Sequence, residues 1–324
     1  MTSSGKTAPR IAVAGCGAWG RNHVRTMQAL GALAAVCDAS ETAAAAASTA
    51  AGVPARAWRD VLADPAIDGV VIAAPDALHA AMGREALAAG KHALVEKPMA
   101  MTVADAEDMV REAAAGGLVL MTGHILRYHA AFRKLQGIVA AGACGRPRHI
   151  AARRTHFAGG GARHALWDLG PHDLSMILAL ADRKPLSVRA LYTAFEGDTP
   201  QAGCLALDFG GGLTAEITFS EISPVKLHQI TVAGDAGQVV FEDSKPWPEK
   251  LSIYRPGLAN PRLAPVREGI DLDPAEPLAE EARAFLSAIA GGPTPPSNGA
   301  DAIAIIAILE AASRSADSGK TETL

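Results

Sequence analysis

Apolar runs and helix-like segments alternate along the first part of the chain. Between residues 10 and 122, five short apolar runs occur at 11–14, 33–37, 69–73, 92–96 and 118–121. Their near-continuous apolar character is typical of strands that are buried on both faces. Because segments with helical character separate these runs, the pattern predicts a parallel sheet wound with helices.

Local signals place several of the helices. A helix over 78–89 is predicted to end at Gly90, and a second helix, over 103–115, begins after Thr102, with Asp105 in its first turn. The pair Gly116-Gly117 ends that second helix. The alanine run at 43–47 is predicted to form a crossover helix, because alanine is the strongest helix former.

The pattern changes after a predicted helix over 129–141. Six strands are predicted at 150–156, 186–195, 203–209, 213–220, 226–232 and 238–242, and short glycine-rich links such as 210–212 and 234–237 separate them. Such links favour an antiparallel, meander-like sheet. Half of the 20 prolines lie between residues 246 and 296. This region is therefore predicted to be mostly extended loop, broken by a helix over 278–290 and followed by a last helix over about 300–313.

We therefore expect an α/β protein with two domains. Residues 1–123 form an N-terminal, doubly wound parallel sheet, and residues 124–324 form a C-terminal α+β domain with a large, open, mostly antiparallel sheet. The 324 residues, of which 49% are hydrophobic, are enough for two packed domains.

Charge and cysteine content narrow the function classes. A formal charge of −4 and a pI near 6.2 give no electrostatic footprint for nucleic acid or for an anionic membrane. The four cysteines show no Cys-x-x-Cys spacing, so we expect buried free thiols in a reducing compartment. Lys6 and Arg10 precede an apolar segment, but glycines interrupt that segment, and we expect a cytoplasmic protein without a signal peptide.

A glycine-rich segment, Gly15-Cys16-Gly17-Ala18-Trp19-Gly20, follows the first predicted strand and opens a helix. Its three glycines suit a tight turn, a close approach of backbone to a pyrophosphate, and close packing of helix on strand. The helix N-terminus then offers N–H groups to the phosphates. The segment predicts a dinucleotide-binding turn, at which Ala18 and Trp19 also contact the cofactor.

Asp38 ends the second predicted strand, about 20 residues after the glycine turn. An acidic side chain at this point can accept hydrogen bonds from the hydroxyls of the adenosine ribose. The next residues, Ala39 and Ser40, include no arginine that could hold a 2′-phosphate, and the charge of Asp38 would repel one. NAD is therefore favoured over NADP.

Further candidates follow the third and fourth predicted strands. Ala74-Pro75 and then His79 follow one strand, and Glu96-Lys97-Pro98 ends the next. Ligands collect at the carboxyl edge of open parallel sheets, so we expect these residues to line the cofactor cleft. His79 is not assigned a catalytic role. For Lys97, position alone leaves two interpretations open, a lysine close to the nicotinamide and an ordinary surface lysine.

The segment 166–173 places an acid, Asp168, four residues before a histidine, His172. On a helix this spacing puts both side chains on one face. A carboxylate that orients a histidine is a recurring way to make a general base that works near neutral pH. The alternative is an aspartate at a helix start beside a partly buried histidine.

Taken together, these motifs resemble the Gfo/Idh/MocA oxidoreductases. The segments that carry the resemblance occur in the family's order: the glycine turn with His23, Ala73 to Pro75, Glu96-Lys97-Pro98, Gly123-His124-x-x-Arg127-Tyr128, and Asp168-x-Gly170-x-His172-Asp173. The resemblance implies a Rossmann domain followed by an α/β domain with a large open sheet. It also implies hydride transfer between NAD(P) and a sugar or polyol, by a homodimer or homotetramer.

Residue by residue, the resemblance implies that Lys97 and His172 are catalytic, that Asp168 accompanies the histidine, and that the Lys97-Pro98 peptide is cis. His172 would accept the proton of a substrate hydroxyl, and Lys97 would bind the same oxygen and stabilise its developing charge. Lys97, Asp168 and His172 are therefore also substrate-binding candidates. No metal is expected.

Within the family, the version Leu-Trp-Asp-Leu-Gly-Pro-His-Asp resembles the nucleotide-sugar 3-dehydrogenases. These act on UDP-N-acetylglucosamine or its uronic acid and make a 3-keto sugar for an aminotransferase. The diphosphate of a UDP-sugar needs cations, and four arginines lie in or near the expected substrate region. Of these we assign Arg127, Arg154 and Arg163 to the substrate, together with Trp167, and leave Arg153 unassigned; each arginine can instead lie on a solvated face.

Two alternatives stay open. One is an inositol or simple sugar or polyol dehydrogenase of the same family, and the other is a non-catalytic NAD-binding regulator. The presence of Lys97 and His172 argues against the regulator. The glycine-rich loop 158–162, ahead of Arg163, is a candidate lid.

Overall fold

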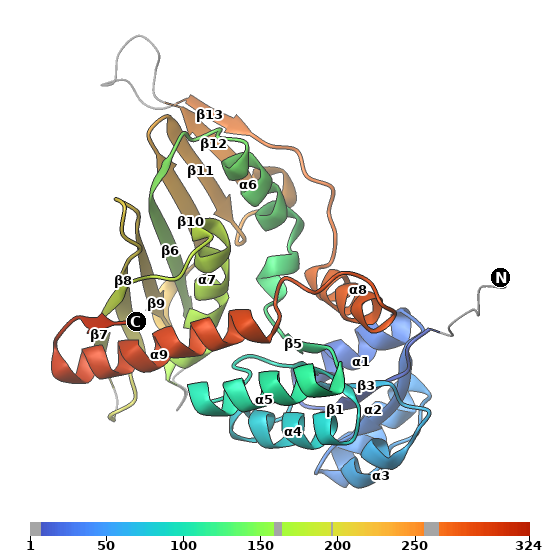
Figure 1. Ribbon diagram of the computed structural model, residues 1–324. Coiled ribbons are helices and arrows are strands. Elements are labelled where there is room, and N and C mark those ends of the chain that lie inside the picture. Colours follow the sequence, from blue (N-terminus) through green and yellow to red (C-terminus); the bar gives the residue numbers. More distant parts are fainter. Residues whose placement is uncertain (1–7, 159–163, 196, 256–265) are drawn as a thin grey trace. The chain divides into compact units, whose positions relative to one another are not determined.

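The computed structural model describes residues 8–158, 164–195, 197–255 and 266–324 (Figure 1). The chain divides into two compact units, residues 1–125 with 276–306 and residues 126–275 with 307–324. Residues 276–306, which the sequence pattern placed in the second domain, thus belong to the first unit. The reason is packing: α8 (Pro277–Ile289) contacts α1 (Gly20–Ala29), and the Ser297 carbonyl accepts the Thr122 N–H at 2.8 Å.

Within the described residues, the first unit has a sheet of five parallel strands in the order β2-β1-β3-β4-β5. The strands are β1 (Ile11–Ala14), β2 (Leu33–Cys37), β3 (Gly69–Ile72), β4 (His92–Val95) and β5 (Leu120–Thr122). Every residue of β1 and β3 is buried, which explains the continuous apolar runs. The predicted doubly wound sheet is confirmed. Its strand order reverses between β1 and β3, where such sheets bind ligands.

The crossover helices of this unit include α2 (Glu41–Ala51), α3 (Trp58–Ala63), α4 (His79–Ala88) and α5 (Val103–Gly116), with a short 3-10 helix η1 (Asp76–Leu78) before α4. Right-handed crossovers place α1 and α2 on one face and α4 and α5 on the other. The predicted cap of α5 is confirmed, since Thr102 Oγ1 accepts the Asp105 N–H at 3.1 Å. The alanine run lies in α2, as predicted, whereas α3 was not predicted.

Within its described residues, the second unit has a nine-stranded sheet in the order β13-β12-β11-β10-β6-β9-β8-β7-β14. All neighbouring strands are antiparallel except β6 and β9, which confirms the expected large, mostly antiparallel sheet. The strands are β6 (Pro147–Phe157), β7 (Ser187–Thr193), β8 (Ala202–Asp208), β9 (Thr214–Ser220), β10 (Ile222–Gly234), β11 (Gly237–Glu242), β12 (Leu251–Arg255), β13 (Val266–Gly269) and β14 (Glu322–Thr323).

The proline-rich region was predicted to be mostly extended loop, broken by one helix, and the prediction missed two short strands there. The region contributes η3 (Trp247–Glu249) and the strands β12 and β13, which pair with each other. Prolines are absent from both strands, so each can donate its N–H groups to the ladder. The predicted helix over 278–290 is present as α8, and the last helix is α9 (Gly299–Ser318).

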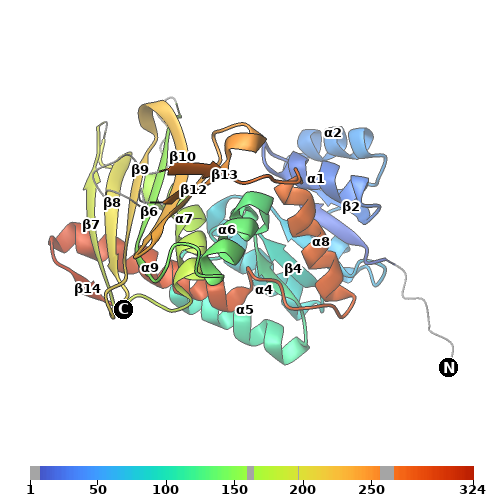
Figure 2. The same cartoon turned by 90° about the horizontal axis from the view of Figure 1, so that it is seen from above.

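Helices cover one face of the nine-stranded sheet. The helices α6 (Ala130–Ala140) and α7 (Ala165–Ala181) contact its strands, and Figure 2 shows them on the same side. On the uncovered face, Leu191, Cys204, Thr218 and Arg153 are register partners on four adjacent strands, and Leu191 is 58% exposed. This alternation of buried and exposed positions is expected for an antiparallel sheet with one packed face.

The sequence predicted buried free cysteines and no membrane-spanning helix. All four cysteines are free, but only Cys16, Cys37 and Cys144 are buried. The expectation was wrong for Cys204, which points outward from β8. Within the described ranges, no helix has the length and apolar character needed to cross a bilayer.

Candidate active site

The glycine turn connects β1 to α1, and at two of its three glycines the backbone leaves no room for a side chain. Gly15 has a φ of 91°, and a Cβ there would lie 2.4 Å from the carbonyl oxygen of Ala73. A Cβ at Gly20 would lie 1.8 Å from the carbonyl oxygen of Gly15. A Cβ at Gly17 would instead meet nothing within 4 Å among the described atoms. The outer glycines therefore fix the turn, and Gly17 leaves space for a ligand to approach.

Helix α1 begins at this turn without a side-chain cap among the described residues. By contrast, Ser40 caps α2 and Thr102 caps α5. The residues 17–19 in front of α1 are exposed. The first-turn N–H groups of α1 can therefore bind an anionic group, as the phosphates of a dinucleotide require.

Asp38 follows β2 and is held beside the glycine turn. Its Oδ2 accepts the Cys16 N–H at 2.6 Å, and its Oδ1 accepts the Ser40 N–H at 2.7 Å. Each oxygen keeps a second lone pair, so the carboxylate can also accept ribose hydroxyls. Burial, followed by the charge of Asp38, raises the pKa of the Cys16 thiol to about 11, so this thiol is neutral at physiological pH. These residues fit a dinucleotide.

His79 is buried and joins two turns at the carboxyl edge of the sheet. Its Nδ1 lies 2.7 Å from the Pro98 carbonyl oxygen, and its Nε2 lies 2.8 Å from the Ala74 carbonyl oxygen. Carbonyl oxygens only accept hydrogen bonds, so the imidazole is the donor in either contact. The backbone uses both nitrogens, so the geometry favours a role for His79 in holding the Ala74-Pro75 and Lys97-Pro98 turns over the direct cofactor contact that we expected.

The Lys97-Pro98 peptide is cis, as the resemblance implied. Lys97 is half-buried, and its backbone N–H donates to Glu96 Oε2 at 3.2 Å. The side chain of Glu96 is thus the inner support of this turn. We expected Glu96 to contact the cofactor, but its side chain is buried and its carboxylate belongs to an internal hydrogen-bond network.

That network joins Glu96 to helix α1. The indole N–H of Trp19 donates to Glu96 Oε1 at 2.5 Å, and His23 Nε2 lies 2.7 Å from the same oxygen. Burial raises the pKa of Glu96, but the hydrogen bond and charge of His23, with Trp19 and Lys97, outweigh it and bring that pKa below its ordinary value. A Cβ at Gly123 would lie 2.8 Å from the carboxyl carbon, so the glycine after β5 makes room for this charge.

Helix α7, in the second unit, carries Asp168 and His172, both half-buried. Since α7 is continuous from 165 to 181, the pair lies on one helix face, as predicted. A Cβ at Gly170 would lie 2.8 Å from Leu166 Cδ1 and 3.3 Å from Leu309 Cδ2. Gly170 thus permits close packing of α7, which fixes the position of the candidate pair. Trp167 is half-buried on the same helix.

A buried ion pair fastens α7 to the sheet. Arg154, on β6, donates to Asp173 through Nε at 3.0 Å and Nη2 at 2.8 Å, and the two side chains are 7% and 1% exposed. Burial raises the pKa of Asp173 above its ordinary value, and the charge and hydrogen bonds of Arg154 oppose this. We expected Arg154 to bind a substrate diphosphate, but its bidentate bonds to Asp173 make it a support of the helix that carries His172.

The other arginines have different surroundings. Arg127 is half-buried, and its Nη1 donates to the Ser175 carbonyl on α7 at 3.2 Å. Arg153 is exposed on the uncovered face, because it is adjacent to Arg154 in the alternating strand. Arg163 and most of the candidate lid 158–162 lie outside the described residues. Arg127 and Arg154 thus both lie beside α7, but Arg154 is bound to the Asp173 carboxylate whereas Arg127 donates to a backbone carbonyl.

Two histidines extend the polar region beside Arg154. His228, on β10, is the register partner of Arg154, and its ring lies 5.9 Å from that of His156. Burial, followed by the charges of Arg154 and Lys226, lowers the pKa of His228 to about 4. His228 is therefore neutral at physiological pH, and its Nε2 is buried without a hydrogen-bond partner among the described atoms. A neutral imidazole suits an uncharged hydroxyl or amide.

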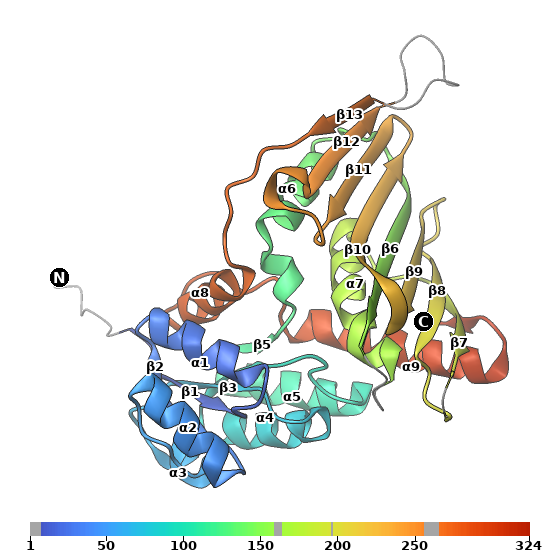
Figure 3. The same cartoon turned by 180° about the vertical axis from the view of Figure 1, so that it is seen from behind.

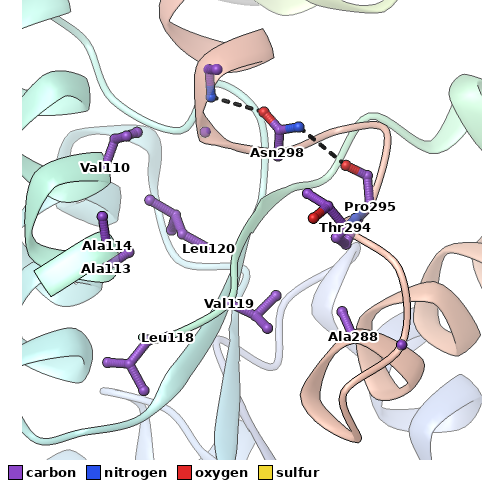
Figure 4. Close-up of a pocket in the computed structure, with 13 residues that line it drawn as sticks. Val110, Ala113, Ala114, Leu118, Val119, Leu120, Ala288, Thr294, Pro295 and Asn298 are labelled. Carbon is purple, nitrogen blue, oxygen red and sulfur yellow. Dashed lines mark hydrogen bonds between the residues drawn. The ribbon is translucent and has the colours of Figure 1, made fainter. Parts of the chain in front are cut away.

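A separate pocket of about 330 Å³ lies in the first unit (Figure 4). It is formed by α5, the start of β5 and the loop before α9, where Asn298 bonds to the Pro295 carbonyl and the Ala300 N–H. This is the amino end of β5, whereas the glycine turn, Asp38 and Lys97 follow carboxyl ends. Its described lining carries no charged side chain. The pocket is therefore not the cofactor cleft.

Comparisons with known proteins cover both units. Residues 9–124 match the family described as "Oxidoreductase family, NAD-binding Rossmann fold", and residues 132–240 match "GFO/IDH/MocA C-terminal domain". UDP-N-acetylglucosamine 3-dehydrogenase of Acidithiobacillus ferrooxidans is 33% identical over 290 residues, which cover 87% of this chain and 88% of that protein. The chain belongs to the Gfo/Idh/MocA oxidoreductase family.

Other Gfo/Idh/MocA relatives act on different compounds. By name, one is 1,5-anhydro-D-fructose reductase of Ensifer adhaerens, 29% identical over 82% of each chain. Inositol 2-dehydrogenase 1 of Saccharopolyspora erythraea is 33% identical over 46% of this chain and 48% of its own. A solved structure of the Acidithiobacillus ferrooxidans enzyme superposes with a TM-score of 0.87 at 26% identity, covering 97% of this chain and 99% of that one. The first unit is thus an NAD(P)-binding Rossmann domain of an oxidoreductase.

Sequence reasoning missed several polar residues that support the candidate site. Asp173 is paired with Arg154, His228 is the register partner of Arg154, and Glu281 of α8 is buried near Glu96. One signal was available: Glu281 occupies an apolar-stripe position between Leu278 and Phe285, where an acid is out of pattern. The partner of Arg154 had no local signal, because it comes from another element.

Proposed function

We propose that this protein is an NAD-dependent dehydrogenase that oxidises a sugar hydroxyl to a ketone. The favoured substrate is a UDP-N-acetylglucosamine-type nucleotide sugar, oxidised at C3. The observation that carries the proposal is the 33% identity to UDP-N-acetylglucosamine 3-dehydrogenase over 87% of this chain, with Lys97, Asp168 and His172 all present. Arg127, beside α7, is the described cation best suited to the diphosphate.

NAD is favoured over NADP by the geometry of Asp38. The carboxylate is fixed by two backbone N–H groups at the end of β2 and keeps lone pairs for the ribose hydroxyls. A 2′-phosphate at this position would meet a like charge, which is destabilising at hydrogen-bond distance.

The proposed chemistry assigns one task to each side chain. Bound NAD would accept the hydride from the carbon that bears the hydroxyl. The His172 imidazole takes the hydroxyl proton, so the carbon–hydrogen and oxygen–hydrogen bonds are replaced by a carbonyl. The Lys97 ammonium stabilises the negative charge that develops on the oxygen, and Asp168 orients His172. Reduction reverses each step.

A second candidate is an inositol or simple sugar dehydrogenase. It is favoured by the use of Arg154 in an ion pair with Asp173 and by the neutral His228 beside it, which suit an uncharged polyol better than a diphosphate. The similarity to inositol 2-dehydrogenase 1 supports the same class.

The test is turnover of NAD with a panel of UDP-N-acetylglucosamine, its uronic acid, myo-inositol and simple hexoses, followed by NADH absorbance. Hydroxylamine traps the ketone and draws an unfavourable equilibrium forward, and mass spectrometry identifies the oxidised sugar. We expect turnover with a UDP-sugar. Turnover with inositol but with no UDP-sugar would select the second candidate, and NAD binding without any turnover would favour the regulator.

The same assay tests the catalytic residues. Lys97→Ala and His172→Ala are each expected to lower kcat by about 10²-fold or more while NAD binding is retained, because each removes a group that acts on the reacting oxygen. His149→Ala, at an exposed histidine of β6, is the matched control and should keep the wild-type rate. Unchanged rates in either catalytic variant would contradict the assignment.

A further inference from the structure

Glu281 is an acid in a core position. Helix α8 buries Leu278, Glu281, Ala282 and Phe285, which is the stripe that an amphipathic helix turns toward a core. Glu281 is 0% exposed, and among the described residues neither of its carboxyl oxygens has a hydrogen-bond partner. A carboxylate there would lose its hydration without compensation. Its protonation state therefore needs a physical account.

Glu281 faces the network around Glu96. One side-chain nitrogen or oxygen from each of His23, Glu96 and Glu281 lies within 4.8 Å of the other two. The three residues come from α1, the end of β4 and α8, and Figures 1 and 3 both show α8 beside α1. Lys97 adds a charge next to Glu96.

Two arginines near the contact between α8 and α1 are paired with acids other than Glu281. Arg25 of α1 pairs with Glu276 at the start of α8, and within α8 Arg283 pairs with Glu280 at an exposed position. Neither arginine is paired with Glu281. Among the described residues, the titratable groups placed against Glu281 are His23 and Glu96.

Two buried carboxyl groups this close do not both keep a charge without a cation between them. Glu96 accepts hydrogen bonds from the Trp19 indole and the Lys97 N–H, and it faces His23. These groups favour a negative charge on Glu96. Glu281 has no such donor, and burial, followed by the charge of Glu96, raises the pKa of Glu281 well above its ordinary value.

We propose that Glu281 is a positioning residue that carries a proton at neutral pH, so that the cluster of His23, Glu96 and Glu281 holds a single carboxylate charge, on Glu96. With Glu281 neutral, Glu96 keeps the Trp19 indole and the Lys97 N–H. Ionised Glu281 would repel Glu96 and compete for His23, which loosens the glycine turn and the Glu96-Lys97-Pro98 turn together. The effect on catalysis rests on the proposed function, but the protonation itself does not.

The expected pH dependence follows from the direction of the shift. Because the pKa of Glu281 is raised in the folded protein, its proton is present at neutral pH and is lost as the pH rises through the folded value. Protonation of Glu281 and binding of NAD should then favour each other. NAD affinity is therefore expected to fall by about tenfold as the pH rises above the folded pKa of Glu281. Glu281→Gln is neutral at every pH and should lack this fall.

Infrared difference spectroscopy at neutral pH tests the protonation directly. The C=O stretch of a protonated carboxylic acid is expected in the wild type and in Glu280→Gln, and it should be lost in Glu281→Gln. Glu280 is the matched control because it is the neighbouring acid on α8, is only half-buried and is paired with Arg283. No loss of the acid band in Glu281→Gln would overturn the proposal. A tightly bound divalent ion that metal analysis finds in the wild type, and that Glu281→Gln loses, would overturn it as well.

Calorimetric titration of NAD over a pH series tests the positioning role. We expect the alkaline loss of affinity in the wild type and in Glu280→Gln but not in Glu281→Gln, and parallel profiles in all three would overturn the role. In the wild type alone, the acid band must disappear over the pH range in which NAD affinity falls, so the test does not depend on the folding of a variant. Neither measurement uses a sugar, which separates this proposal from the proposed substrate.

Discussion

At the scale of the residue, backbone hydrogen bonds decide what several candidate side chains can do. Asp38 is pinned by the Cys16 and Ser40 N–H groups and still has lone pairs for a ligand. His79 uses both ring nitrogens on carbonyl oxygens of the two turns at the sheet edge. The first residue is therefore available to select the cofactor, and the second shapes the loops that receive it.

The role of Asp38 can be tested by removing its charge. Asp38→Asn keeps one acceptor oxygen for the Cys16 N–H but no longer repels a 2′-phosphate. We expect the ratio of kcat/KM for NADP over NAD to rise by about tenfold or more, which corresponds to about 1.4 kcal/mol. Steady-state kinetics with both cofactors measures the ratio, and Asp60→Asn, at an exposed acid of α3, is the control. An unchanged ratio would argue against cofactor selection by Asp38.

At the scale of the element, α7 combines a chemical face with a structural anchor. Asp168 and His172 lie on one face of the helix, while Asp173 is bound by Arg154 of β6. A buried ion pair contributes little net stability, since desolvation offsets its attraction, but loss of one partner leaves an uncompensated charge. We therefore expect the Arg154–Asp173 pair to determine the position of α7 more than it contributes to the net free energy of folding.

Unfolding measurements can separate these effects. Arg154→Met should destabilise the protein by about 3–5 kcal/mol, and the double variant with Asp173→Leu should recover most of that loss, because no unpaired charge remains. Arg148 lies on the same strand as Arg154, and its exposed pair with Asp235 is removed in Arg148→Met, which should cost about 1 kcal/mol or less. Urea unfolding followed by circular dichroism measures all three. Equal effects of Arg154→Met and Arg148→Met would contradict the assignment.

At the scale of the whole molecule, no helix among the described residues of the second unit packs on the outer face of its sheet. This face carries four register partners on adjacent strands, Leu191, Cys204, Thr218 and Arg153, and Leu191 is 58% exposed. Open sheet faces and exposed apolar side chains are common sites of association. We therefore keep the expectation of a homodimer or homotetramer, with this face covered by a second copy of the chain.

Light scattering of the purified protein tests this expectation. The wild type should have the mass of a dimer or a tetramer of the 33.3 kDa chain. Leu191→Lys should shift the protein toward the single-chain mass, because it places a charge in the buried centre of the contact. Val266→Lys, on the exposed edge strand β13, should leave the mass unchanged. A wild type with the mass of one chain would rule out the oligomer.

The sequence predicted those features that depend on local pattern. Continuous apolar runs located the five parallel strands, and Gly15, Gly17 and Gly20 located the cofactor turn, because close backbone contacts admit no side chain at two of them. It failed for β12 and β13, where dense prolines in the region concealed two short strands between them. It also failed for Cys204, whose direction depends on which face of the sheet is covered.

The sequence by itself thus determined the family and the α/β class, since these follow from periodicity and from motifs in a fixed order, and it predicted the residues proposed for hydride transfer. Only the tertiary structure decided which polar side chains are already bound to, or buried by, other groups of the protein. Arg154 is bound by Asp173, His79 by two carbonyls, and Glu281 is buried near Glu96. Each of these contacts joins residues that are remote along the chain or on different elements. Hydrogen bonding and burial, on which charge state depends, are properties of the folded neighbourhood.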